Sequence, residues 1–385
     1  MTSKFPLFKE SEHQKLSAER LIETKWVLLK ERRKQKGLRS DMNFNEFLKK
    51  EALSFIDTAS LNHEVLSKDK MQSEHLLSLQ RYVEKIVTER RIDAGKEKLK
   101  IWERQLKKIQ KNWGVPPEVI IAIWGIETNF GEILGRYRVI DSLATLAFAA
   151  KGERRRALFK SELLALETIK NKKGIEVESL VGSWAGASGH TQFMPTTYLK
   201  FSASFESKNV PNIWNKESPL DALSSTACYL KNLGWIREGF ILKKAIKPKN
   251  IDYLETGINL TVENGFTAPF GHSGPHFKFD KNASAIFHYN RSELYVFGVW
   301  LFSSALQSMP QKILWPKNRE QISSSEILVM QERLMLLGYD TFGVDGKLGV
   351  NTKKALIGFQ KAVGQMPDGY PDRLIFKKLL SQPSP

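Results

Sequence analysis

The sequence holds few of the features that mark disulfide-stabilised or membrane-spanning proteins. Its 385 residues include one cysteine, Cys228, so no internal disulfide can form. Cys228 lies in a helix-like stretch, and we expect it to be a small buried hydrophobe. No apolar run approaches the length of a membrane span, so no integral membrane span is predicted. The first residues, Met1–Pro6, also lack the apolar centre of a secretion signal.

Acidic residues are scarce relative to basic ones, and the formal net charge is +17. A positive field attracts polyanions of any kind. Nucleic acid is one such partner, but the chain contains no recognised nucleic-acid-binding motif. An anionic cell-wall polymer or membrane surface fits the charge equally well, so charge alone does not identify the partner.

One glutamate ends an apolar segment. Pro116 and Pro117 suit the first turn of a helix, where a missing N–H costs nothing, and most of the following residues up to Ile126 are apolar. A helix that is apolar all round is predicted to be buried. Glu127 ends this helix, and apolar surroundings raise the pKa of a carboxyl group by removing its hydration. It can then act as a general acid near neutral pH, although a helix-end glutamate that touches water fits this segment equally well.

A second segment, residues 182–198, is rich in small and polar residues. Residues 182–189 are all small apart from Trp184, so their backbone can pass close to a ligand or to another surface. Taken alone, a glycine-rich turn packed against a neighbour explains these residues better than a binding site does. Side chains suited to a polar substrate rich in hydroxyls are those of Ser183, Thr191 and Gln192.

Together the two segments resemble the catalytic centre of the lytic murein transglycosylase B family. That family has a Gly-Val-Pro-Pro-Glu helix ending in Glu-Thr, and later a Gly-Ser-Trp-Ala-Gly-Ala stretch leading to Gln-Phe-Met-Pro. Both motifs are present here without gaps, at residues 114–128 and 182–195. The resemblance covers most of residues 45–310 and ends in a Tyr-Asn run that includes Tyr289, Asn290 and Tyr295. It implies a mainly α, lysozyme-like catalytic domain with a small β element.

The resemblance also implies a mechanism with one carboxylate. Glycoside hydrolases usually use two, but neither Asp141 nor Asp221 lies in a setting that looks catalytic. By resemblance, Glu127 first protonates the oxygen between N-acetylmuramic acid and N-acetylglucosamine, and then takes the proton from the muramoyl C6 hydroxyl. The product is a 1,6-anhydro sugar, formed without water. The substrate-binding residues that the motif positions imply are Ser183, Gln192, Tyr229, Tyr289 and Asn290.

No metal and no cofactor is expected. Some family members carry a calcium loop, but Ser204 and Lys208 stand where acidic ligands would be needed, and a lysine repels a cation. His272 and His276 lie in a Gly- and Pro-containing loop without a carboxylate or cysteine near them in sequence, which favours a loop role over a metal site.

Two patterns lie outside the motifs. Basic residues recur mostly three or four positions apart between Lys96 and Lys111, so we expect them to share one solvated helix face. Alternation between Ile258 and Val262 predicts a short strand pair with irregular loops around it.

The last part of the chain resembles a different family. Pro310, Pro316 and a serine run at residues 323–325 indicate a linker. The run that follows contains Gln-x-x-Leu, Leu-Gly-Tyr, Asp-Gly-x-x-Gly-x-x-Thr and Phe-Gln, like the small three-helix peptidoglycan-binding domain. We expect a catalytic domain at residues 1–310, a linker at 311–325 and a peptidoglycan-binding domain at 326–380.

The hypothesis is thus a peptidoglycan lytic transglycosylase that acts on glycan strands. Its alternatives are a hydrolytic muramidase and a noncatalytic peptidoglycan-binding wall protein; a nucleic-acid binder rests on charge alone. A pure binder need not keep Glu127, Ser183, Gln192 and Tyr289 together. The resemblance implies a periplasmic enzyme whose signal peptide has been removed or replaced. We expect a monomer without a nucleic-acid partner.

Overall fold

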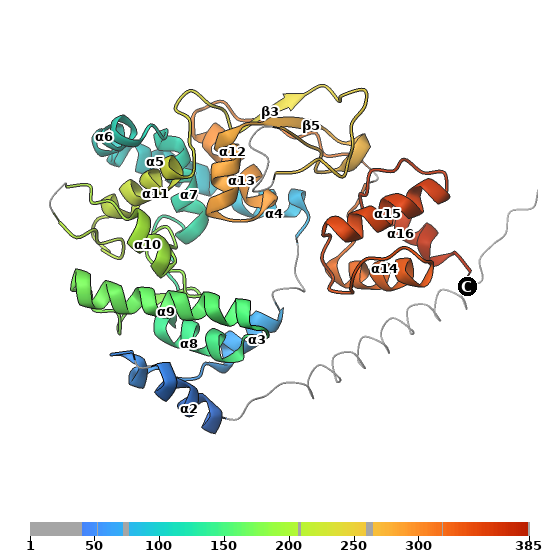
Figure 1. Cartoon of the computed structure of the whole chain (residues 1–385). Coiled ribbons are helices and arrows are strands. Elements are labelled where there is room, and N and C mark those ends of the chain that lie inside the picture. The colour runs from blue at the N-terminus through green and yellow to red at the C-terminus, as the bar shows by residue number, and fades with distance from the viewer. Residues whose placement is uncertain are drawn as a thin grey trace, which may run out of the picture. The chain divides into compact units, whose positions relative to one another are not determined.

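A computed structural model describes residues 41–51, 53–71, 77–206, 209–258, 265–317 and 319–383, and these residues are mostly helical (Figure 1). The chain divides into two compact units, Met1–Phe47 and Leu48–Pro385, and helix α2 (Asp41–Glu51) crosses the boundary. All the site residues predicted from the sequence lie in the second unit. The prediction of a mainly α fold with a small β element is confirmed.

The elements of the second unit follow one another along the chain in a mixed order, with the strands confined to two small sheets. The helices are α3 (His63–Met71), α4 (Leu79–Ile86), α5 (Glu89–Ile101), α6 (Glu103–Trp113), α7 (Pro117–Thr128), α8 (Val139–Ala149), α9 (Glu153–Lys173), α10 (Pro195–Phe201), α11 (Leu220–Asn232), α12 (Lys281–Tyr289), α13 (Glu293–Leu306), α14 (Ser324–Leu336), α15 (Val350–Ala362) and α16 (Arg373–Leu380). The strands are β1 (Tyr137–Arg138), β2 (Val181–Gly182), β3 (Leu242–Ala245), β4 (Gly265–Thr267) and β5 (His276–Phe279).

Helix α7 lies at the centre of the largest hydrophobic core. As predicted, Pro116 precedes it as the N-cap and Pro117 opens it, and residues 119–125 are buried. The helix packs against α13, which is also apolar along most of its length. The two helices approach closely at Gly125, where an added Cβ would lie 2.8 Å from the rings of Phe130 and Phe302. These contacts fix the axis of the helix that ends in Glu127.

The β element is larger than the sequence indicates. In place of a strand pair, the structure has a three-stranded antiparallel sheet in the order β3-β5-β4, with Leu242 and Gly265 both opposite Phe279. Ile258 lies outside these strands, and residues 259–264, which include most of the predicted alternation, fall outside the described residues. The third strand, β5, begins at His276, so the prediction that His276 lies in a loop was wrong. Gly274 and Pro275, directly before it, are residues typical of a loop.

The prediction of one continuous basic face was wrong. Helix α5 ends at Ile101 and α6 begins at Glu103, because Trp102 takes a non-helical conformation between them. The basic side chains therefore lie on two helices. Most of them are nevertheless exposed, as expected for a solvated surface.

The C-terminal helices α14, α15 and α16 share a hydrophobic core of their own. Ser323, within the serine run expected to mark a linker, is the N-cap of α14 and forms a capping box with Glu326. Two glutamines organise the turns that follow: Gln331 bonds the Asp345 loop, as Gln360 bonds Asp368. The Asp345 loop is thus a hydrogen-bonded turn.

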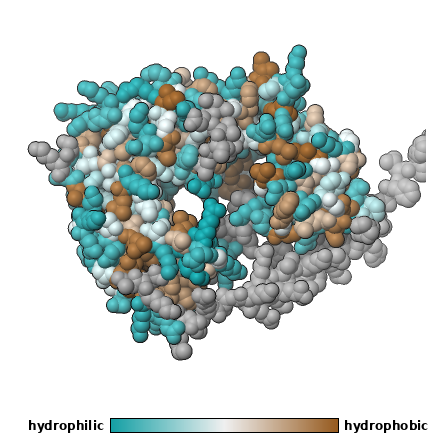
Figure 2. Space-filling view, in the orientation of Figure 1, coloured by the Kyte–Doolittle hydropathy of each residue, from teal (hydrophilic) through white to brown (hydrophobic). Residues whose placement is uncertain are grey.

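In the view of Figure 2, hydrophilic residues predominate on the visible face, with hydrophobic ones scattered among them.

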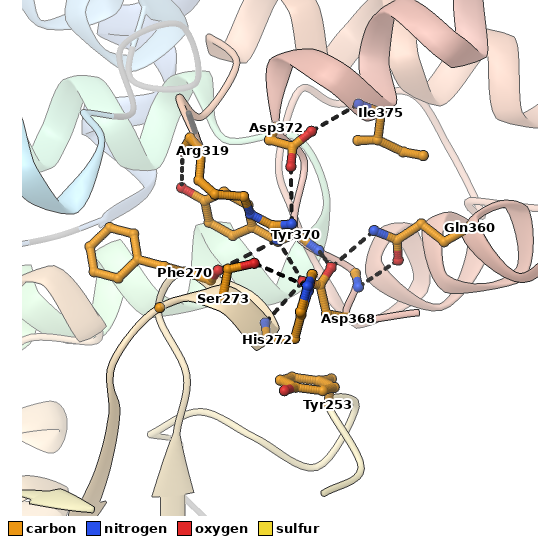
Figure 3. Close-up of polar contacts among 12 residues, drawn as sticks. Tyr253, Phe270, His272, Ser273, Arg319, Gln360, Asp368, Tyr370, Asp372 and Ile375 are labelled. Carbon is orange, nitrogen blue, oxygen red and sulfur yellow. Dashed lines mark hydrogen bonds and ion pairs between the residues drawn. The ribbon is translucent and has the colours of Figure 1, made fainter. Parts of the chain in front are cut away.

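Asp368 joins these helices to the small sheet. Figure 3 shows its carboxylate among three side-chain donors: Arg319 at 2.5 Å, His272 Nδ1 at 2.7 Å and Gln360 at 2.9 Å. Arg319 also pairs with Asp372 at 3.1 Å and lies over the Tyr370 ring. Asp368 is fully buried, so this cluster ties residues before β5, residues after α13 and the C-terminal helices together.

No helix in the described part of the chain is long and apolar enough to cross a membrane.

Candidate active site

The end of α7 is held in an unusual conformation. Asn129 and Phe130, directly after the helix, have φ values of 50° and 60°, which non-glycine residues rarely adopt. Such strained residues persist only where the surroundings determine them, and they cluster at functional sites. Here Arg91 donates hydrogen bonds to the Asn129 side chain at 3.2 Å and to the Ile86 carbonyl at 2.6 Å. The last turn, which carries Glu127, is therefore fixed from outside.

Glu127 combines the two environments that the sequence left open, because the residue is partly exposed and yet its carboxyl group is desolvated. Burial raises the pKa of its carboxyl group to about 7, and a hydrogen bond from Tyr295 acts in the opposite direction. The Tyr295 hydroxyl donates to Glu127 Oε1 at 2.6 Å from helix α13. Burial, followed by the nearby Glu127 charge, raises the pKa of the Tyr295 phenol well above its usual value, so this group remains a donor. At neutral pH, Glu127 exchanges readily between its acid and carboxylate forms.

Three tyrosines form a cluster next to this carboxyl group. The Tyr289 ring stacks on Tyr295 with centroids 6.3 Å apart and an interplanar angle of 6°, and Tyr229 lies 5.3 Å from Tyr289. Phe193 contacts both Tyr229 and Tyr289. The Tyr289 hydroxyl donates to the Thr191 carbonyl at 2.7 Å. The cluster thus joins α11, α12 and α13 to the glycine-rich loop.

Ser183 lies in a tight turn of that loop. Its N–H donates to the Ala187 carbonyl at 2.7 Å, and its side-chain oxygen accepts from the Ala187 N–H at 3.1 Å. Gly186 lets the turn approach α8, because a Cβ there would lie 2.4 Å from Leu143. The glycine in this turn therefore serves close packing.

Gln192 has a strained backbone with φ of 52°. Its amide nitrogen donates to the carbonyls of Gly189 at 3.0 Å and Leu134 at 3.3 Å, so backbone groups orient this side chain. Asn290 is exposed at the C-terminal end of α12. Within the described residues, ring contacts join Tyr229 and Tyr289 to Tyr295, which bonds Glu127. The hydrogen bonds of Ser183 are made with Ala187 instead.

Asp141 and Asp221 have structural partners. Asp141 accepts from the Ser60 N–H at 2.9 Å and pairs with Arg138 at 3.1 Å. Asp221 accepts from two backbone N–H groups, those of Phe205 and Asn212, each at 2.8 Å. Both carboxylates hold loops together, which agrees with the sequence-based view that neither is catalytic.

The histidine-containing loop has a partner that sequence spacing could not reveal. His272 bonds Asp368, which lies 96 residues further along the chain. In the described part of the chain, no group of three or more His, Cys, Asp or Glu residues is arranged to hold a metal ion. Ser204 bonds the Glu206 carbonyl in the loop compared with a calcium site, and Lys208 lies outside the described residues. Cys228 is buried, as expected.

Sequence reasoning assigned no role to three residues of this region: Trp124, His190 and Tyr295. Tyr295 belongs to the Tyr-Asn run of the resemblance, but that run does not indicate that its hydroxyl bonds Glu127. His190 and Trp124 lie inside the two motifs, but nothing in their spacing indicates that they contact each other.

The chain is similar to known proteins over most of its length. Residues 30–304 match the family model described as transglycosylase SLT domain, and residues 323–379 match a peptidoglycan binding domain model. The chain is 35% identical over 157 residues to membrane-bound lytic murein transglycosylase B of Escherichia coli (strain K12). That match covers 41% of this chain and spans 42% of the relative's length.

Solved structures are similar over more of the chain. The structure of SltB3 from Pseudomonas aeruginosa in complex with NAG-anhNAM-pentapeptide superposes with a TM-score of 0.77 and 30% identity, covering 89% of this chain and 98% of that chain. The soluble lytic transglycosylase SltB1 of the same organism gives a TM-score of 0.61 and 25% identity, covering 69% of this chain and 98% of that one. The Escherichia coli lytic transglycosylase Slt35 in complex with bulgecin A gives 0.57 and 25%, covering 70% and 94%.

Proposed function

The chain belongs to the transglycosylase SLT domain family, and we propose that it is a lytic transglycosylase that cleaves peptidoglycan glycan strands without water. The observation that carries the proposal is the single carboxyl group of Glu127, whose pKa burial raises to about 7 within a cluster of tyrosines. One residue that acts first as acid and then as base needs a pKa near the working pH.

In the first step, protonated Glu127 gives its proton to the oxygen between N-acetylmuramic acid and N-acetylglucosamine. The C1–O bond breaks, and the muramoyl ring gains oxocarbenium character, which its own 2-acetamido group can stabilise. The carboxylate left behind keeps the Tyr295 hydrogen bond at Oε1. A hydrogen bond from a neutral donor to a charged acceptor is stronger than one to a neutral acceptor, so Tyr295 favours this step.

In the second step, the Glu127 carboxylate takes the proton of the muramoyl C6 hydroxyl. The freed oxygen attacks C1 and closes the 1,6-anhydro ring, which returns Glu127 to its protonated form. No second carboxylate is needed, because the nucleophile belongs to the substrate. Asp141 and Asp221, the other carboxylates considered, are occupied by Arg138 and by backbone donors.

We assign the substrate-binding roles to the residues around this carboxyl group. Tyr229 and Tyr289 present aromatic surface and hydroxyls beside it, and sugar rings pack well on such surfaces. The remaining assignments rest on motif position and on the turn geometry described above: Ser183, Gln192 and Asn290.

We further propose that residues 326–380 hold the enzyme on the wall, with residues 1–310 as the catalytic domain and 311–325 as the connection. The match to a peptidoglycan binding domain supports this division. A module attached to the catalytic domain raises the local concentration of an insoluble polymer at the active site. The net charge of +17 suits an anionic polymer. We propose a periplasmic monomer.

Mass spectrometry of the products from purified sacculi tests the proposal. A lytic transglycosylase releases muropeptides with 1,6-anhydromuramic acid, each lighter by one water than its hydrolytic counterpart. Products that carry a reducing end and the extra water would instead identify a hydrolytic muramidase. Binding of sacculi without any product would identify a noncatalytic wall protein.

A further inference from the structure

A buried histidine links the two motifs of the active site. His190 lies in the glycine-rich loop and is 4% exposed. Both of its ring nitrogens have partners: Trp124 Nε1 lies 3.1 Å from Nδ1, and the Asn215 carbonyl oxygen lies 2.8 Å from Nε2. An indole N–H can only donate and a carbonyl can only accept. Nδ1 is therefore the acceptor and Nε2 carries the hydrogen, so the imidazole is neutral and its tautomer is fixed.

The backbone of His190 is joined to the same two elements. The Thr128 hydroxyl donates to the His190 carbonyl at 2.6 Å, and the His190 N–H donates to the Ile213 carbonyl at 3.1 Å. Trp124 and Thr128 lie on either side of Glu127 in the last turns of α7. Two hydrogen bonds thus hold the end of that helix, and two more hold the loop at residues 213–215.

The space around the imidazole fits its ring. An added Cβ on Gly131, which has φ of +88°, would lie 2.6 Å from two ring atoms of His190. The Trp124 ring meets the imidazole edge-on, with centroids 5.7 Å apart. Such close packing restricts the imidazole to one orientation, so a displacement of the ring also displaces α7.

We propose that His190 is a positioning residue which, as a neutral imidazole, fixes the carboxyl group of Glu127 relative to Ser183 and Gln192. The proposal rests on the transglycosylase function proposed above. His190 is not itself a catalytic group, because protein atoms occupy both ring nitrogens. It acts by holding the helix that carries the acid against the loop that carries the other two side chains.

Protonation would break this link. A second N–H on Nδ1 would point at the Trp124 N–H, so an attraction would become a repulsion between two donors. Burial lowers the pKa of His190, and the Asn215 carbonyl opposes this effect. The link is therefore intact above pH 6.5 and is lost only at lower pH, as pH falls through the lowered pKa of His190. The titratable residues on the surrounding elements are Glu127, Glu132, Lys216, Glu217 and Tyr289. The hydrogen-bond partners of the two ring nitrogens are not these residues but Trp124 and Asn215.

Two substitutions and one matched control test the proposal. His190→Leu removes both ring contacts, whereas His190→Asn offers an oxygen near the position of Nδ1 and does not titrate. His276→Asn changes another buried histidine, 4% exposed on β5, that lies outside the link to α7. The assay is release of 1,6-anhydro products from soluble glycan chains between about pH 4.5 and about pH 9, with a thermal melt of each protein at each pH.

We expect His190→Leu to lower kcat at neutral pH by roughly 10²-fold with a smaller change in KM, which is the cost of misplacing a reacting group. We expect His190→Asn to keep kcat within about tenfold of the wild type and to lose the acid limb below pH 6.5. His276→Asn should keep both kcat and the acid limb.

A wild-type acid limb in His190→Asn would overturn the proposal, as would a wild-type kcat in His190→Leu. If His190→Leu does not fold, the pH profile of His190→Asn decides alone. A wild-type protein without anhydro products at any pH would contradict the proposed function instead. In that case the thermal melts test whether neutral His190 holds α7 to the loop. The melting temperature of the wild type must then fall more steeply below pH 6.5 than that of His190→Asn. Melting temperatures that fall equally in the two proteins would overturn the proposal.

Discussion

The hydroxyl of Tyr295 determines how easily Glu127 loses its proton, and Tyr295→Phe removes only that hydroxyl. The ring, which is 2% exposed on α13, keeps its packing. A hydrogen bond to a charged group contributes about 1.5–3 kcal/mol and one to a neutral group about 0.5–1.5 kcal/mol. The carboxylate therefore loses about 1–2 kcal/mol more than the protonated acid does. Since one pH unit corresponds to about 1.4 kcal/mol, the pKa of Glu127 should rise by roughly one unit.

The consequence is visible in the pH dependence of kcat/KM. Glu127 must be protonated to begin the reaction, so activity falls as pH rises through its pKa, which is about 7 in the wild type. In Tyr295→Phe this alkaline limb should move toward higher pH by roughly one unit. The assay is initial release of anhydro products from a soluble glycan at low substrate concentration.

Tyr289→Phe is the matched control, because its hydroxyl donates to the Thr191 carbonyl and not to Glu127. That variant can lose activity, but its alkaline limb should remain at the wild-type pH. An alkaline limb that stays in place in Tyr295→Phe, or moves toward lower pH, would refute the reasoning.

Two further predictions concern stability. The pKa of Glu127 is raised from 4.5 to about 7 on folding, so wild-type stability falls as pH rises between these values. Glu127→Gln should therefore be more stable than the wild type above pH 7, by on the order of 2–3 kcal/mol, and should show no such gain near pH 4.5. Urea unfolding at both pH values measures the free energy of unfolding of each protein. Equal gains in stability at the two pH values would contradict this prediction. Asp368→Asn removes one of the two carboxylates that pair with the Arg319 guanidinium and leaves only Asp372, so it should cost up to roughly 3–5 kcal/mol in the same assay. A loss below about 1 kcal/mol would mean that the cluster around Asp368 contributes little.

The catalytic helix could be predicted because its signals are local. Two prolines set its start, apolar residues fill its length, and Glu127 and Asn129 mark its end, so the chain itself specifies α7. The family and the mainly α fold followed from motifs of this kind, and both predictions are confirmed. The raised pKa of Glu127 followed from the apolar composition of the same segment.

What the sequence could not supply were partners distant in the chain. The hydroxyl that bonds Glu127 belongs to a residue 168 positions away, and His272 finds its carboxylate 96 positions away. Spacing rules describe neighbours on one element and say nothing about such pairs. The small sheet was underestimated for a related reason, since strands of three or four residues are stabilised by pairing with each other rather than by their own pattern.

The central claim is that Glu127 alone carries both proton transfers, and the most direct test compares the wild type with Glu127→Gln. The glutamine keeps the shape of the side chain and can still accept the Tyr295 hydrogen bond, but it can neither give nor take the proton. Loss of general acid–base catalysis costs roughly 10²–10⁴-fold, and the loss should be at least this large when one group serves both steps. Purified sacculi are digested with each protein, the 1,6-anhydromuropeptides are quantified by mass spectrometry, and a thermal melt confirms that the variant is folded. We predict anhydro products from the wild type and a loss of at least about 10²-fold in the variant. A folded Glu127→Gln protein that releases anhydro products at near the wild-type rate would contradict the account.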